Sequence, residues 1–359
     1  MKKILVIVLI CLVGAIYWGL RPRVPLEQPV QKESFSSSNE TGLTDSNRQA
    51  SLPAKDSQIT PAIERLRKTL RGGTNEEIEA ALQALAQLLQ NDPGVHEVWA
   101  SFAAESDPDM LAQLARLLTP RVAANAELFK KVVALAQRGD LAEKRSAALS
   151  MLSSISDPRP ELLDLVFRLS REDGAKDVRL SAIQLIENWA SHSQNWDDLS
   201  RELVKTINAS NESEVRRYAI QVIALHPKAT APEVLGAMAG YLKKDPSAHN
   251  RAIAALGLGN VRGELRHTAL DHLEQAFAGE ENVNTRRNII TQIARAGQQD
   301  AIAILNRLPV HQDTLLAQDV RDYVEILQAG GTAPDNIYFA KFARDTERGT
   351  IVGSYDHAD

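Results

Sequence analysis

The sequence predicts an all-α protein whose main part is an α-solenoid of about seven helix pairs. A pattern with a small residue among apolar neighbours recurs every 33 to 37 residues, centred at positions 81, 115, 148, 182, 219, 252 and 289. A period of this length is typical of stacked helical units that bury their apolar faces against each other. Apolar residues make up 44% of the chain but aromatic residues only 5%, without strand-like alternation, which favours helices throughout.

Residues 1–20 predict a membrane anchor. An uninterrupted apolar run extends from Ile4 to Leu20, with Lys2 and Lys3 before it and Arg21 after it. As a helix this run is about 25 Å long, near the short limit for crossing a bilayer. We expect a single-pass protein of the inner (cytoplasmic) membrane, with its body outside the cytoplasm, in the periplasm if the source is a bacterium. The alternative is a cleaved signal peptide.

Residues 21–58 predict a disordered linker. Pro22, Pro25 and Pro29 and the run Ser36–Ser38 lie among many Gln, Asn and Lys residues, and no apolar periodicity appears. Such a segment cannot bury enough apolar surface to fold. It would hold the body at a root-mean-square reach of about 35 Å from the anchor.

Residues 59–329 predict the solenoid itself, because helical signals begin at Thr60-Pro61 and continue to about Gln328. Asp-Pro pairs begin at positions 92, 107, 157 and 245. They suit the points between helices, since Asp caps the next helix and Pro is tolerated in its first turn.

Residues 330–359 form a tail after Gly330-Gly331, which ends the last helix. The tail carries four large apolar residues, which we expect to cover the exposed face of the last repeat, since terminal repeats need a cap. The alternative is a docking peptide for a partner. These residues are Ile337, Tyr338, Phe339 and Phe342.

The repeats resemble HEAT repeats, specifically the short bacterial HEAT-like kind related to the bilin-lyase repeats. That family's second helix reads Asp-Pro-x-Val-Arg-x-x-Ala-x-x-Ala-Leu-Gly, and residues 245–257 match it with His249 in place of Arg. Val178-Arg179 and Val215-Arg216 match it in part. The resemblance covers about residues 60–328 and implies a right-handed superhelix whose second helices line the concave face. A rival for the first 50 residues of the body is the tetratricopeptide repeat, which Ala80-Ala81-Leu82, Asp92-Pro93 and Trp99 resemble.

One repeat position carries Arg145, Arg179, Arg216 and Arg286, with His249 in the remaining copy. The favoured interpretation is structural: an Arg in the first turn of each second helix bonds backbone carbonyls or acids between repeats. The HEAT-like pattern and the acidic body both support it. The alternative is a basic ladder for an acidic ligand.

Two rows of mostly polar or small residues, four positions apart, share a face of the predicted second helices. We expect them to contribute to a binding surface on the concave face, the alternative being an ordinary solvated helix face. The candidate binding residues are Gln184, Arg217, Gln221, Asn250, Arg287 and Thr291.

Charge and composition argue against several kinds of site. The net charge is −5, and an acidic protein does not attract phosphate backbones, so no nucleic-acid partner is expected. The only cysteine, Cys11, lies in the apolar run, and His267 and His272 are five apart, so they point to different helix faces. We therefore expect no metal ion and no cofactor.

Two enzyme families built from HEAT-like repeats share single features with the sequence. The HEAT-like deoxyhypusine hydroxylases need several His-Glu pairs to hold two irons, whereas His96-Glu97 is a single pair. Trp189 and Trp196, together with Asp197-Asp198, loosely resemble the Trp and Asp that HEAT-like alkylpurine DNA glycosylases place in a basic groove. The acidic charge of this chain argues against that activity.

The sequence therefore predicts a membrane-tethered HEAT-repeat scaffold that is not an enzyme and binds a protein or peptide partner in the cell envelope. Two alternatives stay open. One is a HEAT-like enzyme of the bilin-lyase type, which would need a deep pocket with convergent polar groups. The other is a tetratricopeptide-like adaptor.

Overall fold

The structure is a computed structural model, and it describes most of the predicted solenoid. The described residues are 58–89, 92–191, 196–226, 231–296, 298–334 and 337, all within one unit of the chain, residues 55–359. The predicted anchor at 1–20 and all but the last residue of the predicted linker at 21–58 lie outside them. None of the described helices combines the length and the apolar character that crossing a bilayer requires.

The described residues form α-helices and two short 3-10 helices, with no strand among them. The α-helices are α2 (Ile59–Gly72), α3 (Asn75–Leu88), α4 (Asp92–Ala104), α5 (Pro108–Val122), α6 (Ala126–Arg138), α7 (Ala142–Met151), α8 (Pro160–Glu172), α9 (Lys176–Ala190), α10 (Trp196–Ala209), α11 (Ser213–Leu225), α12 (Pro232–Lys244), α13 (Ala248–Gly259), α14 (Arg266–Gly279), α15 (Val283–Ala296), α16 (Gln298–Arg307) and α17 (Thr314–Gln328). The 3-10 helices are η1 (Leu152–Ser154) and η2 (Gly263–Leu265).

Consecutive α-helices pack as pairs, from α2 with α3 to α16 with α17. The described residues thus hold eight pairs, one more than the repeated pattern indicates. The additional pair is α16 and α17. The pattern does not reveal it because α16 has only 10 residues and the centre of α17 carries Val320 instead of a small residue.

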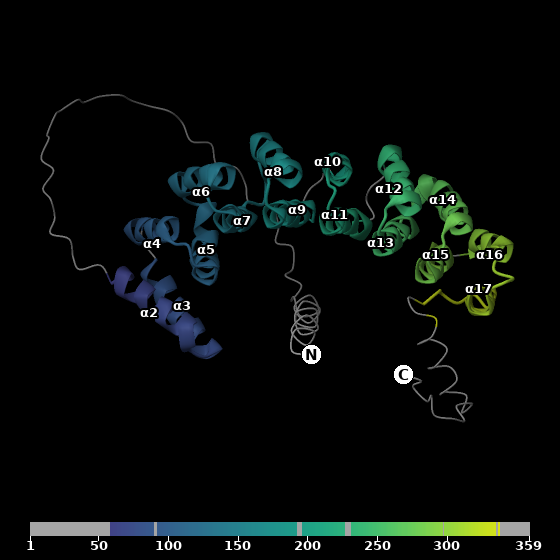
Figure 1. Cartoon of the computed structure of the whole chain (residues 1–359), viewed down its shortest axis with the longest axis horizontal. Coiled ribbons are helices and arrows are strands. Elements are labelled where there is room, and N and C mark those ends of the chain that lie inside the picture. The colour runs from purple at the N-terminus through teal and green to yellow at the C-terminus, as the bar shows by residue number, and fades with distance from the viewer. Residues whose placement is uncertain are drawn as a thin grey trace, which may run out of the picture. The chain divides into compact units, whose positions relative to one another are not determined.

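The pairs stack in two layers (Figure 1). The second helices of the pairs contact one another in chain order, from α3 through α5, α7, α9, α11, α13 and α15 to α17. The first helices α6, α8, α10, α12 and α14 form the other layer in the same way, as do α2 and α4. The side-by-side stacking that the repeat period predicts is therefore present.

A small or branched apolar residue stands at the centre of the layer of second helices. Ala148, Ala182, Ala219, Ala254 and Ile289 are each fully buried. In α13 the central residue is Ala254 and not the predicted Ala252, so the sequence alignment of this repeat is wrong by two positions. The reason is that α13 begins at Ala248, with Ser247 as its N-cap.

Asp-Pro pairs do not all play the predicted role. Asp107 caps α5 as expected: its Oδ1 accepts a hydrogen bond from the backbone N–H of Met110 at 3.0 Å, and Pro108 opens the helix. Asp245 instead ends the preceding helix as the C-cap of α12. The alignment of α13 was displaced because Asp245-Pro246 was matched to the Asp-Pro that opens the HEAT-like pattern.

The chain turns back after α17. Gly330 has φ +78°, a conformation that favours glycine, and the Tyr323 hydroxyl donates to the Pro334 carbonyl at 3.3 Å. Ile337, one of the four apolar tail residues, is buried. The other three lie outside the described residues.

Candidate binding sites

A ladder of arginines joins successive second helices. It consists of the fourth residue of α7, α9, α11 and α13: Arg145, Arg179, Arg216 and Arg251. Each guanidinium Nη1 donates to the backbone carbonyl six residues earlier, at Gly139, Asp173, Ser210 and Asp245 respectively. The ladder member of α13 is thus Arg251, not the predicted His249. Arg286, the fourth residue of α15, departs from this pattern: its Nη2 donates to the Pro309 carbonyl at 3.2 Å, and its guanidinium lies 4.4 Å from the centre of the Phe277 ring.

Each ladder arginine also binds a carboxylate of the following pair. Arg145 binds Asp173 at 2.8 Å, Arg216 binds Asp245 at 2.8 Å and Arg251 binds Glu280 at 2.7 Å, while Arg179 binds the half-exposed Glu212 at 2.7 Å. Asp173, Asp245 and Glu280 are buried and form the C-caps of α8, α12 and α14. The four guanidinium groups therefore bind carbonyls and carboxylates of the chain itself. This confirms the structural interpretation, and these four arginines do not form a basic ladder for an acidic ligand.

The buried carboxylates of the ladder are held ionised. Burial by itself would raise the pKa of Asp245, but hydrogen bonds from Arg216, the Ser247 N–H and Asn250 outweigh it and keep this pKa below its usual value. The same balance lowers the pKa of Asp173 and of Glu280. Charge-assisted hydrogen bonds of this kind stabilise the junction between two neighbouring pairs.

Three predicted binding residues come together between α9 and α11. Gln184, Arg217 and Gln221 line an open hollow of about 450 Å³, and Arg217 Nη1 donates to Gln221 Oε1 at 3.4 Å. The neighbouring Tyr218 hydroxyl donates to Glu187 at 2.8 Å, and burial raises the pKa of Tyr218. The hollow is polar and shallow.

Arg287 and Thr291 lie together on α15 but face another part of the fold. Arg287 Nε donates to Asp319 of α17 at 3.0 Å, and the hydroxyls of Thr291 and Tyr323 lie 3.0 Å apart. Burial raises the pKa of Asp319, in spite of the neighbouring Arg287 charge. These two residues join α15 to α17.

Asn250 does not lie on a surface at all. It is fully buried, and its amide donates to the Ser213 carbonyl at 3.1 Å and to Asp245 Oδ1 at 3.2 Å. The expectation that it lines a binding face is wrong because of the two-residue error in the alignment of α13. At the correct register Asn250 stands at the buried position that Val215 occupies in α11.

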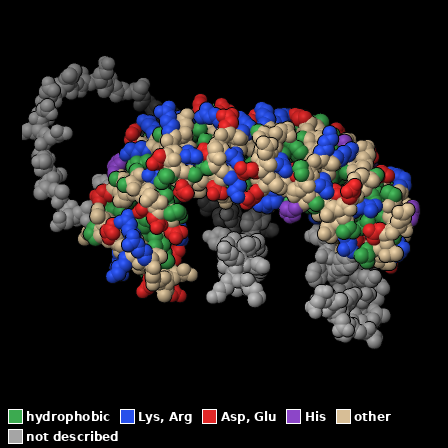
Figure 2. Space-filling view, viewed as in Figure 1, with side chains coloured by type: hydrophobic (Ala, Val, Ile, Leu, Met, Phe, Trp, Pro, Cys, Tyr) green, Lys and Arg blue, Asp and Glu red, His purple; other side chains and the backbone are tan. Residues whose placement is uncertain are grey.

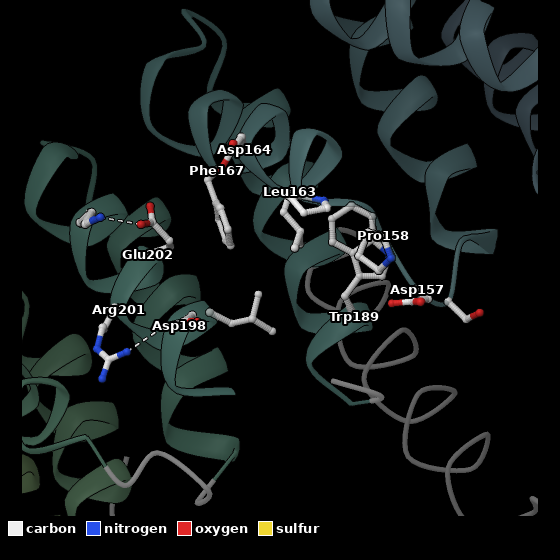
Figure 3. A pocket seen from close by; sticks show the side chains of 13 residues that line it. Asp157, Pro158, Leu163, Asp164, Phe167, Trp189, Asp198, Arg201 and Glu202 are labelled. Atoms are coloured by element: carbon white, nitrogen blue, oxygen red, sulfur yellow. Dashed lines mark hydrogen bonds and ion pairs between the residues drawn. The ribbon is translucent and has the colours of Figure 1, made fainter. Parts of the chain in front are cut away.

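A larger hollow than the one between α9 and α11 lies between the first helices α8 and α10. This α8/α10 groove has a volume of about 940 Å³ and is open to solvent (Figure 3). Its walls come from the loop before α8, from α8 and α10, and from the end of α9. The lining residues are Ser156, Asp157, Pro158, Pro160, Leu163, Asp164, Phe167, Trp189, Asp198, Leu199, Arg201, Glu202 and Lys205.

The floor of the groove is apolar and held in place. Phe167, Trp189 and Leu199 are largely buried in its walls, and Leu163 is half-buried. The Trp189 indole N–H donates to the Ile155 carbonyl at 2.8 Å, which orients the ring and ties the loop before α8 to α9. Apolar and aromatic linings are typical of binding pockets.

The rim of the groove is charged. On α10, Arg201 binds Asp198 at 2.7 Å and Lys205 contacts Glu202. Arg201 also binds Glu233 of α12, and Arg171 of α8 binds Glu202 at 2.6 Å. On the face seen in Figure 2, basic and acidic side chains are similarly interspersed.

Sequence reasoning did not identify the groove as a candidate site. Of the four residues that resemble those of the glycosylases, Trp189 and Asp198 line the groove, but four of its lining residues are acidic and only two are basic. Trp196 is buried instead, with its ring 4.8 Å from that of His226. Within the described residues, no group of three His, Cys, Asp or Glu side chains could hold a metal ion.

Comparison with known proteins identifies no close relative. No protein-family model matches the chain, and no curated protein matches its sequence. Among solved structures, human deoxyhypusine hydroxylase in complex with glycerol matches with 16% identity, covering 76% of this chain and 96% of that chain, at a TM-score of 0.31.

The structural match corrects one prediction. The sequence led us to expect a protein that is not an enzyme, in part because the chain is built from repeats. The matching structure is that of an enzyme. The expectation that this chain is not an enzyme is therefore wrong where it was inferred from the repeats. At this TM-score the match assigns no activity to this chain, and what the fold shows is a helical-repeat protein.

Proposed function

We propose that this chain is a membrane-tethered helical-repeat protein of the HEAT-like kind, which binds a peptide segment of a protein partner in the α8/α10 groove. The observation that carries the proposal is the groove itself, which has an apolar floor under a charged rim and lies between two neighbouring first helices of the stack. The tether is supported by the apolar run Ile4–Leu20 and its basic flanks.

The groove suits a peptide segment for physical reasons. Its volume of about 940 Å³ is at the upper end of the range typical of ligand pockets. The apolar floor can bury one or two large side chains of a partner, and burial of such anchors supplies most of the affinity at protein interfaces. The charged rim then selects among partners and orients the segment.

Photo-crosslinking in intact cells tests the binding site. A photoreactive amino acid at Lys205, on the groove rim, is expected to capture the same partner reproducibly. Lys130 of α6 is a matched control, because both lysines are exposed and pair with a Glu three residues earlier. We expect no such adduct from Lys130, and loss of the Lys205 adduct when the half-buried Leu163 is replaced by Glu. Equal capture from both positions would contradict the groove as the site.

The tether is tested separately. We expect the full chain to stay in the membrane fraction after alkaline carbonate extraction, and a chain that starts at residue 24 to be released. A C-terminal alkaline phosphatase fusion, which is active only outside the cytoplasm, is expected to be active. Release of the full chain by carbonate would refute the anchor, and activity of a cytoplasmic reporter alone would refute the orientation.

A further inference from the structure

The α8/α10 groove has an uneven charge balance along its rim. Arg201 is bound by both Asp198 and Glu233, and Lys205 is bound by Glu202. Both basic side chains of the rim are thus already neutralised by carboxylates of the chain. An acidic ligand would have to break these pairs before it could use either cation.

Two carboxylates of the rim stand apart from these pairs. Asp157, in the loop before α8, and Asp164, on α8, are exposed, and among the described residues neither forms a salt bridge. Figure 3 shows Asp157 beside Pro158 and Trp189, and Asp164 beside Phe167 on α8. The groove therefore presents uncompensated negative charge next to its aromatic floor.

An apolar floor beneath an acidic rim matches the amphipathic shape of Lys and Arg side chains. Such a side chain lays its aliphatic stem along apolar surface while its charged head stays at the water boundary. The half-buried Leu163 offers most of the apolar surface, beside the small exposed parts of Phe167, Trp189 and Leu199.

We propose that the occupant of the α8/α10 groove is a basic segment of the protein partner, in which Lys or Arg residues alternate with apolar residues. The basic stems pack on Leu163 and on the exposed edges of Phe167 and Leu199, and the charged heads lie beside Asp157 and Asp164. This inference rests on the proposed function and adds the chemistry that selects the partner.

Peptide binding to the full chain in nanodiscs of zwitterionic lipid tests the inference. The probes are three fluorescent peptides of about twelve residues with the same leucines, which differ only in carrying Lys, Gln or Glu between them. We expect the Lys peptide to bind at least about tenfold more tightly than the Glu peptide, with the Gln peptide between them. Higher salt is expected to weaken only the Lys peptide. Empty nanodiscs give the background.

The double variant D157N/D164N is expected to weaken binding of the Lys peptide about tenfold. Both side chains are exposed, so the fold is not at risk. The matched control is E161Q/E172Q, which removes the same charge from exposed positions on α8 outside the groove and is expected to change binding by less than about twofold.

Either of two results overturns the inference: a Lys peptide that binds no better than the Glu peptide, or equal binding to D157N/D164N and to the unmodified chain. If the Lys205 crosslink persists in that case, the groove still binds a partner and only its charge preference is wrong. If the crosslink is absent as well, the proposed function fails with it.

Discussion

Replacing Asp245 by Ala is expected to lower the free energy of unfolding by about 3 to 5 kcal/mol. Asp245 is one of the most buried carboxylates described, with 2% of its side chain exposed. Arg216, the Ser247 N–H and the Asn250 amide all donate to it, at 2.8, 2.9 and 3.2 Å. Its removal leaves a largely buried guanidinium and two other donors without their acceptor, and unpaired buried polar groups are costly.

Urea unfolding followed by far-UV circular dichroism measures this loss. The control is E79A, which breaks the exposed pair between Glu79 and Arg116 in the same layer of second helices. Exposed ion pairs contribute about 0 to 1 kcal/mol, so E79A is expected to move the urea midpoint little. If D245A and E79A moved the midpoint equally, the ladder would not be the junction that we describe.

The pH dependence of the free energy of unfolding gives a second test of the Asp245 carboxylate. Because the pKa of Asp245 is lowered in the folded chain, its stabilising effect is fully present above the pKa of an unfolded Asp, about 3.9. The effect is lost as the pH falls through the lower folded value. The stability difference between the unmodified chain and D245N is therefore expected to be constant from about pH 5 to 7 and to shrink below about pH 4.

The second large effect is expected from G259A at the end of α13. A Cβ atom built on Gly259 lies 2.7 Å from Gln292 Cβ and 2.6 Å from Gln292 Oε1 of α15. The Cβ of Gln292 is attached to the backbone and cannot rotate away, so α13 and α15 must move apart. Overpacking of this kind costs about 1 to 3 kcal/mol, more than the helix propensity of Ala returns.

G236A in the neighbouring helix α12 makes the same chemical change with the opposite expected sign. Nothing lies within 4 Å of a Cβ built on Gly236. The substitution should therefore raise the free energy of unfolding by about 0.5 to 1 kcal/mol through helix propensity alone. Stabilisation by both variants would show that α13 and α15 do not approach as closely as the structure has them.

The sequence predicted the repeat register correctly in α7, α9 and α11 but not in α13. Arg145, Arg179 and Arg216 align correctly because each lies three residues before a buried Ala within the same helix. In α13 the Asp245-Pro246 pair matched the family pattern better than the true start at Ala248, and the alignment moved by two residues. Asn250 was therefore predicted at the surface although it is buried, and Arg251 was missed.

The candidate site was harder to predict than the fold. Gln184, Arg217 and Gln221 do share one hollow, since residues four apart on a helix lie on one face and α9 lies beside α11. The α8/α10 groove has no such signal, because Phe167, Trp189 and Leu199 belong to three different helices. Each of them follows an apolar spacing that is equally typical of a closed core.

The sequence alone determined that the body is a stack of helix pairs. The period, the small central residues and the helical spacing of apolar positions are local properties, and each of them specifies which face of a helix is buried. Only the tertiary structure decided which carboxylate meets each ladder arginine and where neighbouring helices leave a groove. Arg216 and Asp245 are 29 residues apart, and such pairings depend on how closely successive pairs approach, which the side chains of several helices set together.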